Sequence, residues 1–131
     1  MWNLINKERK KLNLDTLSFD YESNFITYNK SFDLLFNNYF SHLSLEGVKT
    51  LLYVKKHYNT NNNVISSYGE NLGNHIINNN YNELELAECF TKGCFNSKLH
   101  YENVIFKKFN YVNINVMKNK LSNNKYRYVI N

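Results

Sequence analysis

The sequence predicts an α+β fold, in which a small and mostly antiparallel sheet is flanked by helices on both faces in an α/β/α sandwich. Apolar residues recur three and four positions apart through much of the chain, and near its end they alternate with polar residues. Helices therefore come first and strands pair late, and helices on both faces are an economical cover for such a sheet. Because no repeat and no proline marks a linker, we expect residues 1–131 to form a single domain.

The composition is that of a folded chain and does not point to nucleic acid. With 131 residues, 43% of them hydrophobic and 16% aromatic, the chain is long and apolar enough to bury a core. The net charge is +5, but the basic residues are spread along the whole chain. Only Lys7, Arg9, Lys10 and Lys11 form a cluster, which we expect on a solvated helix face. No motif of a nucleic-acid-binding fold is found, so we expect no nucleic acid partner.

Two helices are predicted near the start of the chain. Trp2, Ile5 and Leu12 lie at roughly helical spacing with charged residues between them, which indicates a short amphipathic helix. A second and stronger helix is predicted from Asp20, its expected N-cap, to Tyr39. Its apolar residues recur at intervals of three and four: Phe25, Tyr28, Phe32, Leu35, Phe36 and Tyr39.

The middle of the chain predicts a helix, a loop and a strand. A third helix is expected from Ser44 to His57, because it would place several apolar residues on one face. The polar residues 59–63 are expected to form a loop that leads into a short strand from Val64 to Tyr68. A turn at residues 69–73 follows, as its two glycines indicate.

Two further helices precede the strands at the end of the chain. A fourth helix is predicted from Asn82 to Thr91 and could end at Gly93, and a short helix, capped by Asn96 or Ser97, is predicted through Ile105. Apolar residues then alternate with asparagine over 112–116. They alternate again over 126–130, after the polar segment 118–125. The two strands most simply make an antiparallel hairpin.

The two cysteines are not expected to form a bridge. Cys89 and Cys94 are five residues apart, which on a helix turns their side chains about 140° from each other. We expect two thiols buried in an apolar face, and nothing resembles a paired zinc or redox motif.

The sequence predicts no transmembrane segment. No apolar run approaches the roughly 20 residues that a helix needs to span a bilayer. The start, from Met1 to Leu4, also lacks the basic and apolar regions of a signal peptide. The chain is therefore expected to be either cytosolic or a mature fragment from which the targeting segment has been removed.

Several segments carry a resemblance to a known family, in the family's order along the chain. They are Leu4-Ile5-Asn6-Lys7-Glu8-Arg9 with Leu17-Ser18-Phe19-Asp20, then Asn37-Asn38-Tyr39-Phe40-Ser41-His42, Gly69-Glu70-Asn71-Leu72, and Phe95-Asn96-Ser97-Lys98-Leu99-His100-Tyr101-Glu102-Asn103-Val104. With the strand from Tyr111 to Met117 after them, they resemble bacterial members of the CAP superfamily. This superfamily holds the SCP-like domains of cysteine-rich secretory, antigen 5 and pathogenesis-related proteins.

The chain departs from the family pattern at several positions. Phe19 and Phe95 stand where tryptophan is usual, and Lys98-Leu99 replaces Pro-Gly before a histidine. Asparagine also replaces the glycines of the late strand. These changes affect the outline of the expected pocket more than the fold. The disulfides of eukaryotic members are absent, as in many bacterial relatives.

The resemblance implies a site lined by histidine and glutamate. His42, at the end of the second helix, and His100, at the start of a later helix, would face each other across a cleft, with Glu70 beside them. Glu102 is the favoured fourth member, from the His-Tyr-Glu-Asn run, and Glu46, four residues after His42, is the reserve.

Such a cluster could bind a divalent metal or could be purely structural. Two neutral imidazoles can bind zinc and leave positions open for water or a ligand, and nearby carboxylates would orient the rings. Water on that zinc could lose a proton near neutral pH. A buried cluster of this kind can equally satisfy its own hydrogen bonds and join the helices to the sheet.

We therefore expect a secreted or surface-anchored binding module, without enzymatic activity, whose cleft holds a divalent metal, a lipid, a sterol or a peptide. A host or cell-surface protein is the other possible partner. One alternative is a metal-dependent hydrolase or peptidase with His42 and His100 as ligands and Glu70 or Glu102 as general base. The other is a scaffold or host-interaction protein whose cleft has decayed. Location outside the cell, or on its surface, is implied by the resemblance.

Overall fold

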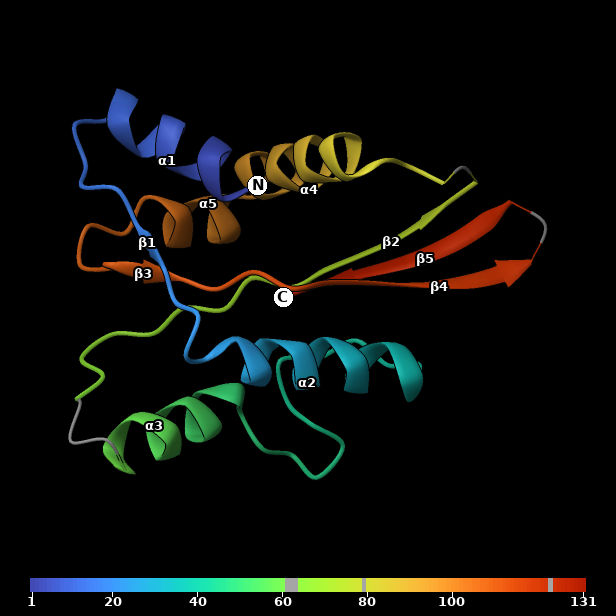
Figure 1. The fold of residues 1–131 in the computed structure, drawn as a ribbon, viewed down its shortest axis with the longest axis horizontal. Coiled ribbons are helices and arrows are strands. Elements are labelled where there is room, and N and C mark those ends of the chain that lie inside the picture. Colours follow the sequence, from blue (N-terminus) through green and yellow to red (C-terminus); the bar gives the residue numbers. More distant parts are fainter. Residues whose placement is uncertain (61–63, 79, 123) are drawn as a thin grey trace.

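The computed structural model describes residues 1–60, 64–78, 80–122 and 124–131. Its elements in chain order are α1 Trp2–Lys11, β1 Ser18–Phe19, α2 Asn24–Phe36, α3 Thr50–Thr60, β2 Gly73–Ile77, α4 Glu83–Asn96, α5 Lys98–Val104, β3 Tyr111–Val112, β4 Val116–Ser122 and β5 Lys125–Ile130. Figure 1 shows the sheet between two groups of helices, which confirms the predicted α/β/α arrangement.

The main sheet has three strands in the order β2-β5-β4, and both pairings are antiparallel. The predicted hairpin is therefore confirmed as β4 and β5, in which Val116 lies opposite Ile130. β4 also takes in residues 118–122 of the polar segment. The first of the two predicted late strands is split in the structure. Its start, Tyr111 and Val112, forms β3, which pairs in parallel with β1 in a separate small sheet.

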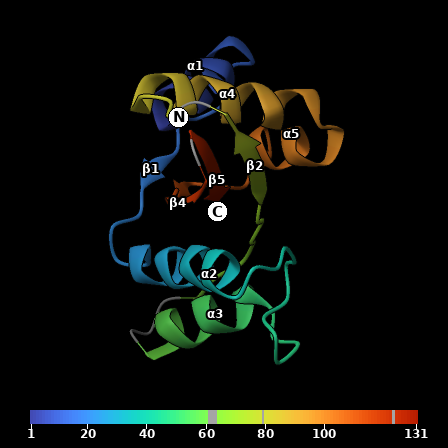
Figure 2. The same cartoon turned by 90° about the vertical axis from the view of Figure 1, so that its right-hand side faces the viewer.

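Each face of the main sheet is covered by its own helices. α1, α4 and α5 lie on one side of the sheet, and α2 and α3 lie on the other (Figure 1, Figure 2). Successive side chains of β5 point to opposite faces, as in any strand. Tyr128 and Ile130 pack with Phe90 of α4, whereas Val129 packs with Leu34 of α2. The core is therefore split into two layers by the sheet.

The basic cluster of α1 is not fully solvated as predicted, because Arg9 is fully buried. Its guanidinium donates hydrogen bonds to the carbonyl oxygens of Asp15 at 2.7 Å and Val104 at 2.8 Å. Two further carbonyls, of Phe106 at 3.1 Å and Phe109 at 3.3 Å, complete the set. Arg9 thus fastens α1 to the loop that follows α5, a contact that local sequence cannot reveal.

α2 begins at Asn24 and ends at Phe36, so it is shorter than the predicted span from Asp20 to Tyr39. Asp20 is not the N-cap, because its carboxylate accepts the backbone N–H groups of Glu22 and Ser23 in a turn before the helix. This turn satisfies the aspartate locally, as short polar side chains often do.

The buried face of α2 is also not the aromatic row that predicted the helix. The buried residues are Ile26, Lys30, Ser31 and Leu34, whereas most of the aromatic residues are half-exposed or exposed: Phe25, Tyr28, Phe32 and Phe36. The last three rings stack along the helix surface, with centroids 6.5 Å and 5.3 Å apart. Both rows have helical spacing, so periodicity alone cannot tell which of them faces the sheet.

The predicted third helix starts later than expected. Residues 44–49 form a turn closed by a hydrogen bond from the N–H of Ser44 to the carbonyl of Val48, at 2.8 Å. Gly47 has a φ of 77°, a left-handed conformation that suits glycine and cannot continue a right-handed helix. α3 therefore begins at Thr50.

The loop and strand predicted after this helix also need correction. Residues 59 and 60 belong to α3, and the remaining part of the expected loop, 61–63, lies outside the described residues. Residues 64–68 are not a strand, and β2 begins only at Gly73. A Cβ atom at Gly73 would lie 2.4 Å from the Ile130 side chain, so the strand pairing requires glycine there.

α4 starts where the sequence predicts but runs past Gly93 to Asn96. Asn82 and Glu85 form a capping box at its start, which is a strong local signal. Nothing lies within 4 Å of a Cβ atom at Gly93, so this glycine neither terminates the helix nor makes a close contact. The predicted short helix is confirmed as α5, which follows Ser97.

Cys89 and Cys94 are both free thiols, in agreement with the prediction that they form no bridge. Cys94 is buried in the cluster of Ile5 and Leu17, and burial raises the pKa of its thiol. Cys89 is partly exposed. In the described part of the chain, no helix has the length and apolar character of a membrane span.

Candidate functional site

The structure brings His42 and Glu70 together. His42 lies in the loop between α2 and α3, and its Nδ1 is 2.7 Å from Oε2 of Glu70, in the segment that precedes β2. The His42 side chain is 58% exposed, whereas that of Glu70 is only 7% exposed. A buried carboxylate therefore orients an imidazole that faces solvent.

The segment that carries Glu70 is locked to α5 by two asparagines. Nδ2 of Asn103 donates to the Asn71 side chain at 2.7 Å and to the carbonyl of Glu70 at 3.4 Å. Nδ2 of Asn71 donates in turn to the carbonyl of His100 at 3.0 Å. A Cβ atom at Gly69 would lie 2.9 Å from the Asn103 side chain, so glycine permits this close approach. The Gly-Glu-Asn and Glu-Asn runs thus form one structural joint.

Lys30 of α2 reaches the loop that carries His42. Its Nζ donates to the carbonyl of Leu43 at 3.0 Å and to the hydroxyl of Tyr39 at 3.4 Å, and it lies 5.2 Å from the centre of the Tyr39 ring. The Tyr39 hydroxyl donates to the carboxylate of Asp33. Lys30 is 7% exposed. Burial lowers its pKa, while the negative charges of Glu70 and Asp33 act in the opposite direction.

Two tyrosines complete this neighbourhood. Burial is the main cause that raises the pKa of Tyr39, and the Asp33 carboxylate adds to it. Burial likewise raises the pKa of Tyr68, with the Glu70 charge as the second cause. Both phenols therefore keep their protons at neutral pH. We call His42, Glu70, Lys30, Tyr39 and Tyr68 the polar site.

Sequence reasoning missed Lys30, although a signal for it exists. Lys30 lies four residues after Ile26 and four before Leu34, so it shares their helix face. A lysine in the middle of a buried apolar row indicates either a wrong choice of face or a buried cation with partners. In this protein, Lys30 is a buried cation with partners.

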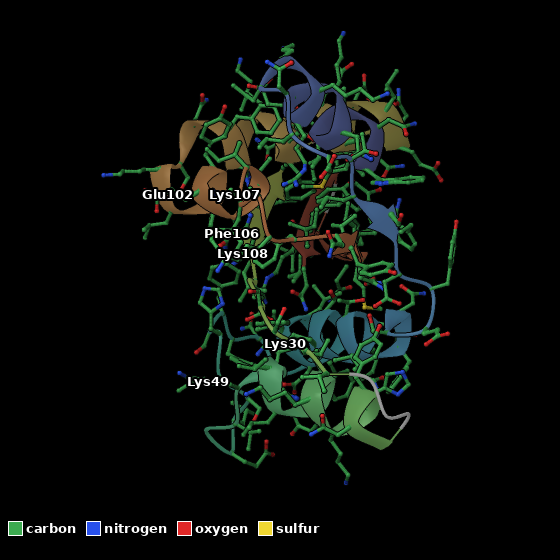
Figure 3. All side chains as sticks on the ribbon, turned by 90° about the vertical axis from the view of Figure 1, so that its left-hand side faces the viewer. Lys30, Lys49, Glu102, Phe106, Lys107 and Lys108 are labelled. Carbon is green, nitrogen blue, oxygen red and sulfur yellow. The ribbon has the colours of Figure 1, made fainter. Side chains whose placement is uncertain are left out.

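The other predicted site residues are not joined to this pair. The main chain of His100 is next to the Glu70 segment, but within the described residues neither its side chain nor that of Glu102 hydrogen-bonds to His42 or Glu70. Glu102 is exposed and lies on α5 at the outer edge of the molecule in Figure 3. Glu46 is exposed in the loop after His42, where its charge contributes to the raised pKa of Tyr39. The roles of these three residues stay predictions.

The donor groups do not fit the zinc site that the resemblance implies. Across the described ranges, no cluster of three or more His, Cys, Asp or Glu side chains could hold a metal ion. Since Nδ1 of His42 is bonded to Glu70, only its Nε2 remains for a metal. Even with the free Oε1 of Glu70, the pair offers fewer than the three protein ligands that zinc sites usually have.

Two hollows lie elsewhere on the molecule, along α1. The first has a volume of about 430 Å³ and lies between α1 and α4, with Leu4 and Phe95 in its wall. The second, of about 680 Å³, lies beside Trp2 and Leu17. Neither is lined by His42 or Glu70. The polar site is thus separate from both hollows.

Comparisons with known proteins agree with this fold. The model of the CAP family, the cysteine-rich secretory protein family, matches residues 2–131. Among solved structures, an outer surface protein from Borrelia burgdorferi matches with a TM-score of 0.60 and 21% identity, over 98% of this chain and 85% of the other. No curated protein matches significantly.

Two longer bacterial proteins contain a similar fold. An extracellular protein with an SCP domain from Bacillus anthracis matches with a TM-score of 0.61 and 19% identity, over 98% of this chain and 38% of the other. A cysteine-rich secretory protein from Staphylococcus aureus has a TM-score of 0.51 and 12% identity, over 98% of this chain and 36% of the other. At such identities the similarity shows the fold alone.

Proposed function

Because the chain belongs to the cysteine-rich secretory protein (CAP) family, we propose that it is a non-enzymatic binding module outside the bacterial cell or on its surface. Its partner would bind at the surface around His42. The location is proposed because similar structures are an outer surface protein and an extracellular protein. The chain spans 38% and 36% of the two longer relatives. The functions of those whole proteins are therefore not assigned to this chain.

The orientation of His42 is the observation that carries this proposal. Its imidazole is 58% exposed, yet its Nδ1 is held at 2.7 Å by the buried Glu70. Nε2 makes no hydrogen bond within the described part of the chain. A group that is already ordered before binding loses little entropy when a partner arrives. His42 is therefore suited to make a hydrogen bond to a partner.

A histidine bonded to a carboxylate can also act as a general base, but it needs a nucleophile or a metal-bound water to deprotonate. No Ser, Thr or Cys side chain of the described residues hydrogen-bonds to His42, and the donor groups do not fit zinc. We therefore place binding before the hydrolase alternative.

A peptide or an exposed segment of a host or cell-surface protein is the partner that we propose, in preference to a lipid or sterol. Apolar ligands need an enclosed apolar pocket, and the polar site lines neither of the two hollows. Its side chains are instead an imidazole, a carboxylate, an ammonium and two phenols, which can pair with the polar groups of a polypeptide.

Titration of ¹⁵N-labelled protein with pooled tetrapeptides of defined sequence tests the binding proposal. We expect shift changes centred on residues 42–43 and 68–72, and about tenfold weaker binding after His42→Ala, as for a lost hydrogen bond of an ordered group. His75→Ala is the matched control, because His75 lies on the α4 side of the sheet, against Phe90. Shift changes confined to other surfaces, or equal binding by the His42 variant, would reject the proposal.

Labelling of intact cells tests the location. We expect a membrane-impermeant amine reagent to label this lysine-rich chain on whole cells of its native organism, and a cytosolic protein with a similar lysine content to stay unlabelled. Labelling only after lysis would place the protein inside the cell and remove that part of the proposal.

A further inference from the structure

We propose that Lys30 is the built-in cation of the polar site: its ammonium group supplies the positive charge that a divalent metal would otherwise bring, and the site therefore does not take zinc. The inference rests on the proposed function in one respect, that the surface around His42 is where a partner binds. It extends that function because it names Lys30 as the residue that determines which charge a ligand of the site can carry.

The placement of Lys30 supports this role. It is 7% exposed at the centre of the buried face of α2. Its Nζ turns to the carbonyl of Leu43, the residue directly after His42, at 3.0 Å, and to the hydroxyl of Tyr39 at 3.4 Å. The ammonium therefore holds the loop that carries the imidazole, as a metal does when it holds its ligands in place.

The acidic groups around Lys30 need a positive charge nearby. Glu70 is 7% exposed, and its Oε1 is buried with no hydrogen bond in the described part of the chain. The carboxylate of Asp33 is bonded to Tyr39, which lies under the ammonium. Buried carboxylates are costly unless hydrogen bonds and opposite charges compensate them. The charges of Glu70 and Asp33 both act on Lys30, so its single positive charge offsets part of their combined negative charge without an added ion.

The same charge would repel a metal. A divalent cation at Nε2 of His42 or at Glu70 would add two positive charges beside a buried ammonium, where screening by water is weak. Lys49, Lys107 and Lys108 lie on the same side of the molecule as Lys30 (Figure 3). These exposed lysines add positive charge on that side, where Figure 3 also places Glu102. With Nε2 of His42 and Oε1 of Glu70 as the donors left free in this pair, zinc has fewer than the three protein ligands that its sites usually have, which is too few to overcome this repulsion.

Calorimetric titration with zinc chloride tests the inference on four proteins: the wild type, Lys30→Met, Lys30→Arg, and Lys30→Met combined with His42→Ala. Met keeps the length of the side chain without its charge, and Arg keeps the charge. We expect no zinc binding by the wild type that depends on His42. We expect Lys30→Met to gain zinc binding with a Kd roughly ten- to a hundredfold below the detection limit of the wild-type titration, as removal of an unfavourable coupling predicts, and His42→Ala to abolish the gain.

Lys30→Arg is expected to behave like the wild type. Equal zinc affinity of the wild type and Lys30→Met would overturn the inference, as would tight zinc binding by the wild type through His42. If Lys30→Met does not fold, as judged by circular dichroism, the imidazole nitrogen signals of wild-type protein with zinc decide instead. A shift of the His42 signal alone would reject the built-in cation, and unchanged His42 and His75 signals would support it.

This test is independent of the peptide titration. Failure of all peptides to bind would remove the proposed function, while the zinc affinities of the Lys30 variants would still show whether the ammonium excludes a metal. If instead peptides bind at His42 and zinc binds equally to the wild type and Lys30→Met, only the inference about Lys30 fails.

Discussion

Arg9 and Lys30 are both buried cations, one in each helical layer, and they are held in different ways. The Arg9 guanidinium donates to four carbonyl oxygens, all of them neutral main-chain groups. The Lys30 ammonium has one carbonyl and one phenol as partners and feels the charges of Glu70 and Asp33. Arg9 is held by main-chain acceptors, with the charge of Asp15 acting on it as well, whereas Lys30 lies near two carboxylates, beside an exposed imidazole.

The difference separates a structural cation from one placed at a site. The planar fork of arginine suits several acceptors in fixed positions. Arg9 uses it to join α1 to residues 104–109, nearly a hundred positions away in the chain. Lysine carries a compact charge on a flexible stem, and Lys30 presents it to the loop of His42. Arg9 should therefore matter most for stability, and Lys30 for stability and site chemistry together.

Arg9→Met should produce the largest loss of stability. It leaves four carbonyl groups without their donor, and we expect the free energy of unfolding to fall by roughly 3–5 kcal/mol, since each buried acceptor left unsatisfied costs about 1–3 kcal/mol and some will be rehydrated. Urea denaturation followed by circular dichroism measures it. Lys10→Met, at an exposed position of the same helix, is the control, with an expected change within about 0.5 kcal/mol. Similar losses for the two variants would contradict the structural role of Arg9.

Lys30→Met should cost less, because Lys30 has fewer hydrogen bonds to lose. We expect a loss of roughly 1–3 kcal/mol, accompanied by faster amide hydrogen exchange in the loop from Tyr39 to Leu43. The substitution is the same as at Arg9, so the two losses can be compared directly. A larger loss at Lys30 than at Arg9 would invert the distinction between the two layers.

The sequence predicted the family and the order of the main elements, because these depend on local signals. The capping box at Asn82, the spacing of α1 and the alternation around Tyr128 all act over a few residues. The Gly-Glu-Asn turn also identified Glu70, which is the hydrogen-bond partner of His42 in the polar site. These local signals remain even where a residue of the family motif differs, as at Phe95, which stands where tryptophan is usual.

The remaining features depend on contacts between distant parts of the chain. Arg9 is buried only because its guanidinium meets Val104 and its neighbours, and Lys30 joins the site only because the loop after α2 folds back over it. The partner of His42 could be named from the resemblance, but not the asparagine contacts that join the Glu70 segment to α5. Periodicity shows that α2 is a helix, but not which of its two rows faces the sheet.

Alkaline pH should reduce the stability that the tyrosines around α2 and α3 contribute. The pKa of Tyr58 is raised from 10.0 to about 12, first by burial and then by its hydrogen bond to Asp20, and burial acts in the same direction on Tyr39 and Tyr68. The unfolded chain loses these protons at lower pH than the folded protein, so their contribution is complete below pH 10.0 and falls as the pH rises to about 12.

Urea denaturation at several pH values measures this effect. Tyr58→Phe should reduce the decline in stability between these pH values, because the variant has one fewer proton to release. Tyr111→Phe, at an exposed position, is the control and should leave the decline unchanged. Equal slopes for Tyr58→Phe and the wild type would show that the Tyr58 hydroxyl does not couple folding to pH.

The smallest effect is expected from the exposed aromatic row of α2, and it tests which row faces the sheet. Phe36 is 74% exposed and stacks on Phe32, whereas Leu34 is fully buried against Val129. Phe36→Ala should lower the free energy of unfolding by about 0.5 kcal/mol or less. Leu34→Ala should lower it by roughly 2–5 kcal/mol, as buried leucines do. If the two losses were reversed, the aromatic row would be the one on the sheet, and Lys30 would then lie in solvent, far from Glu70.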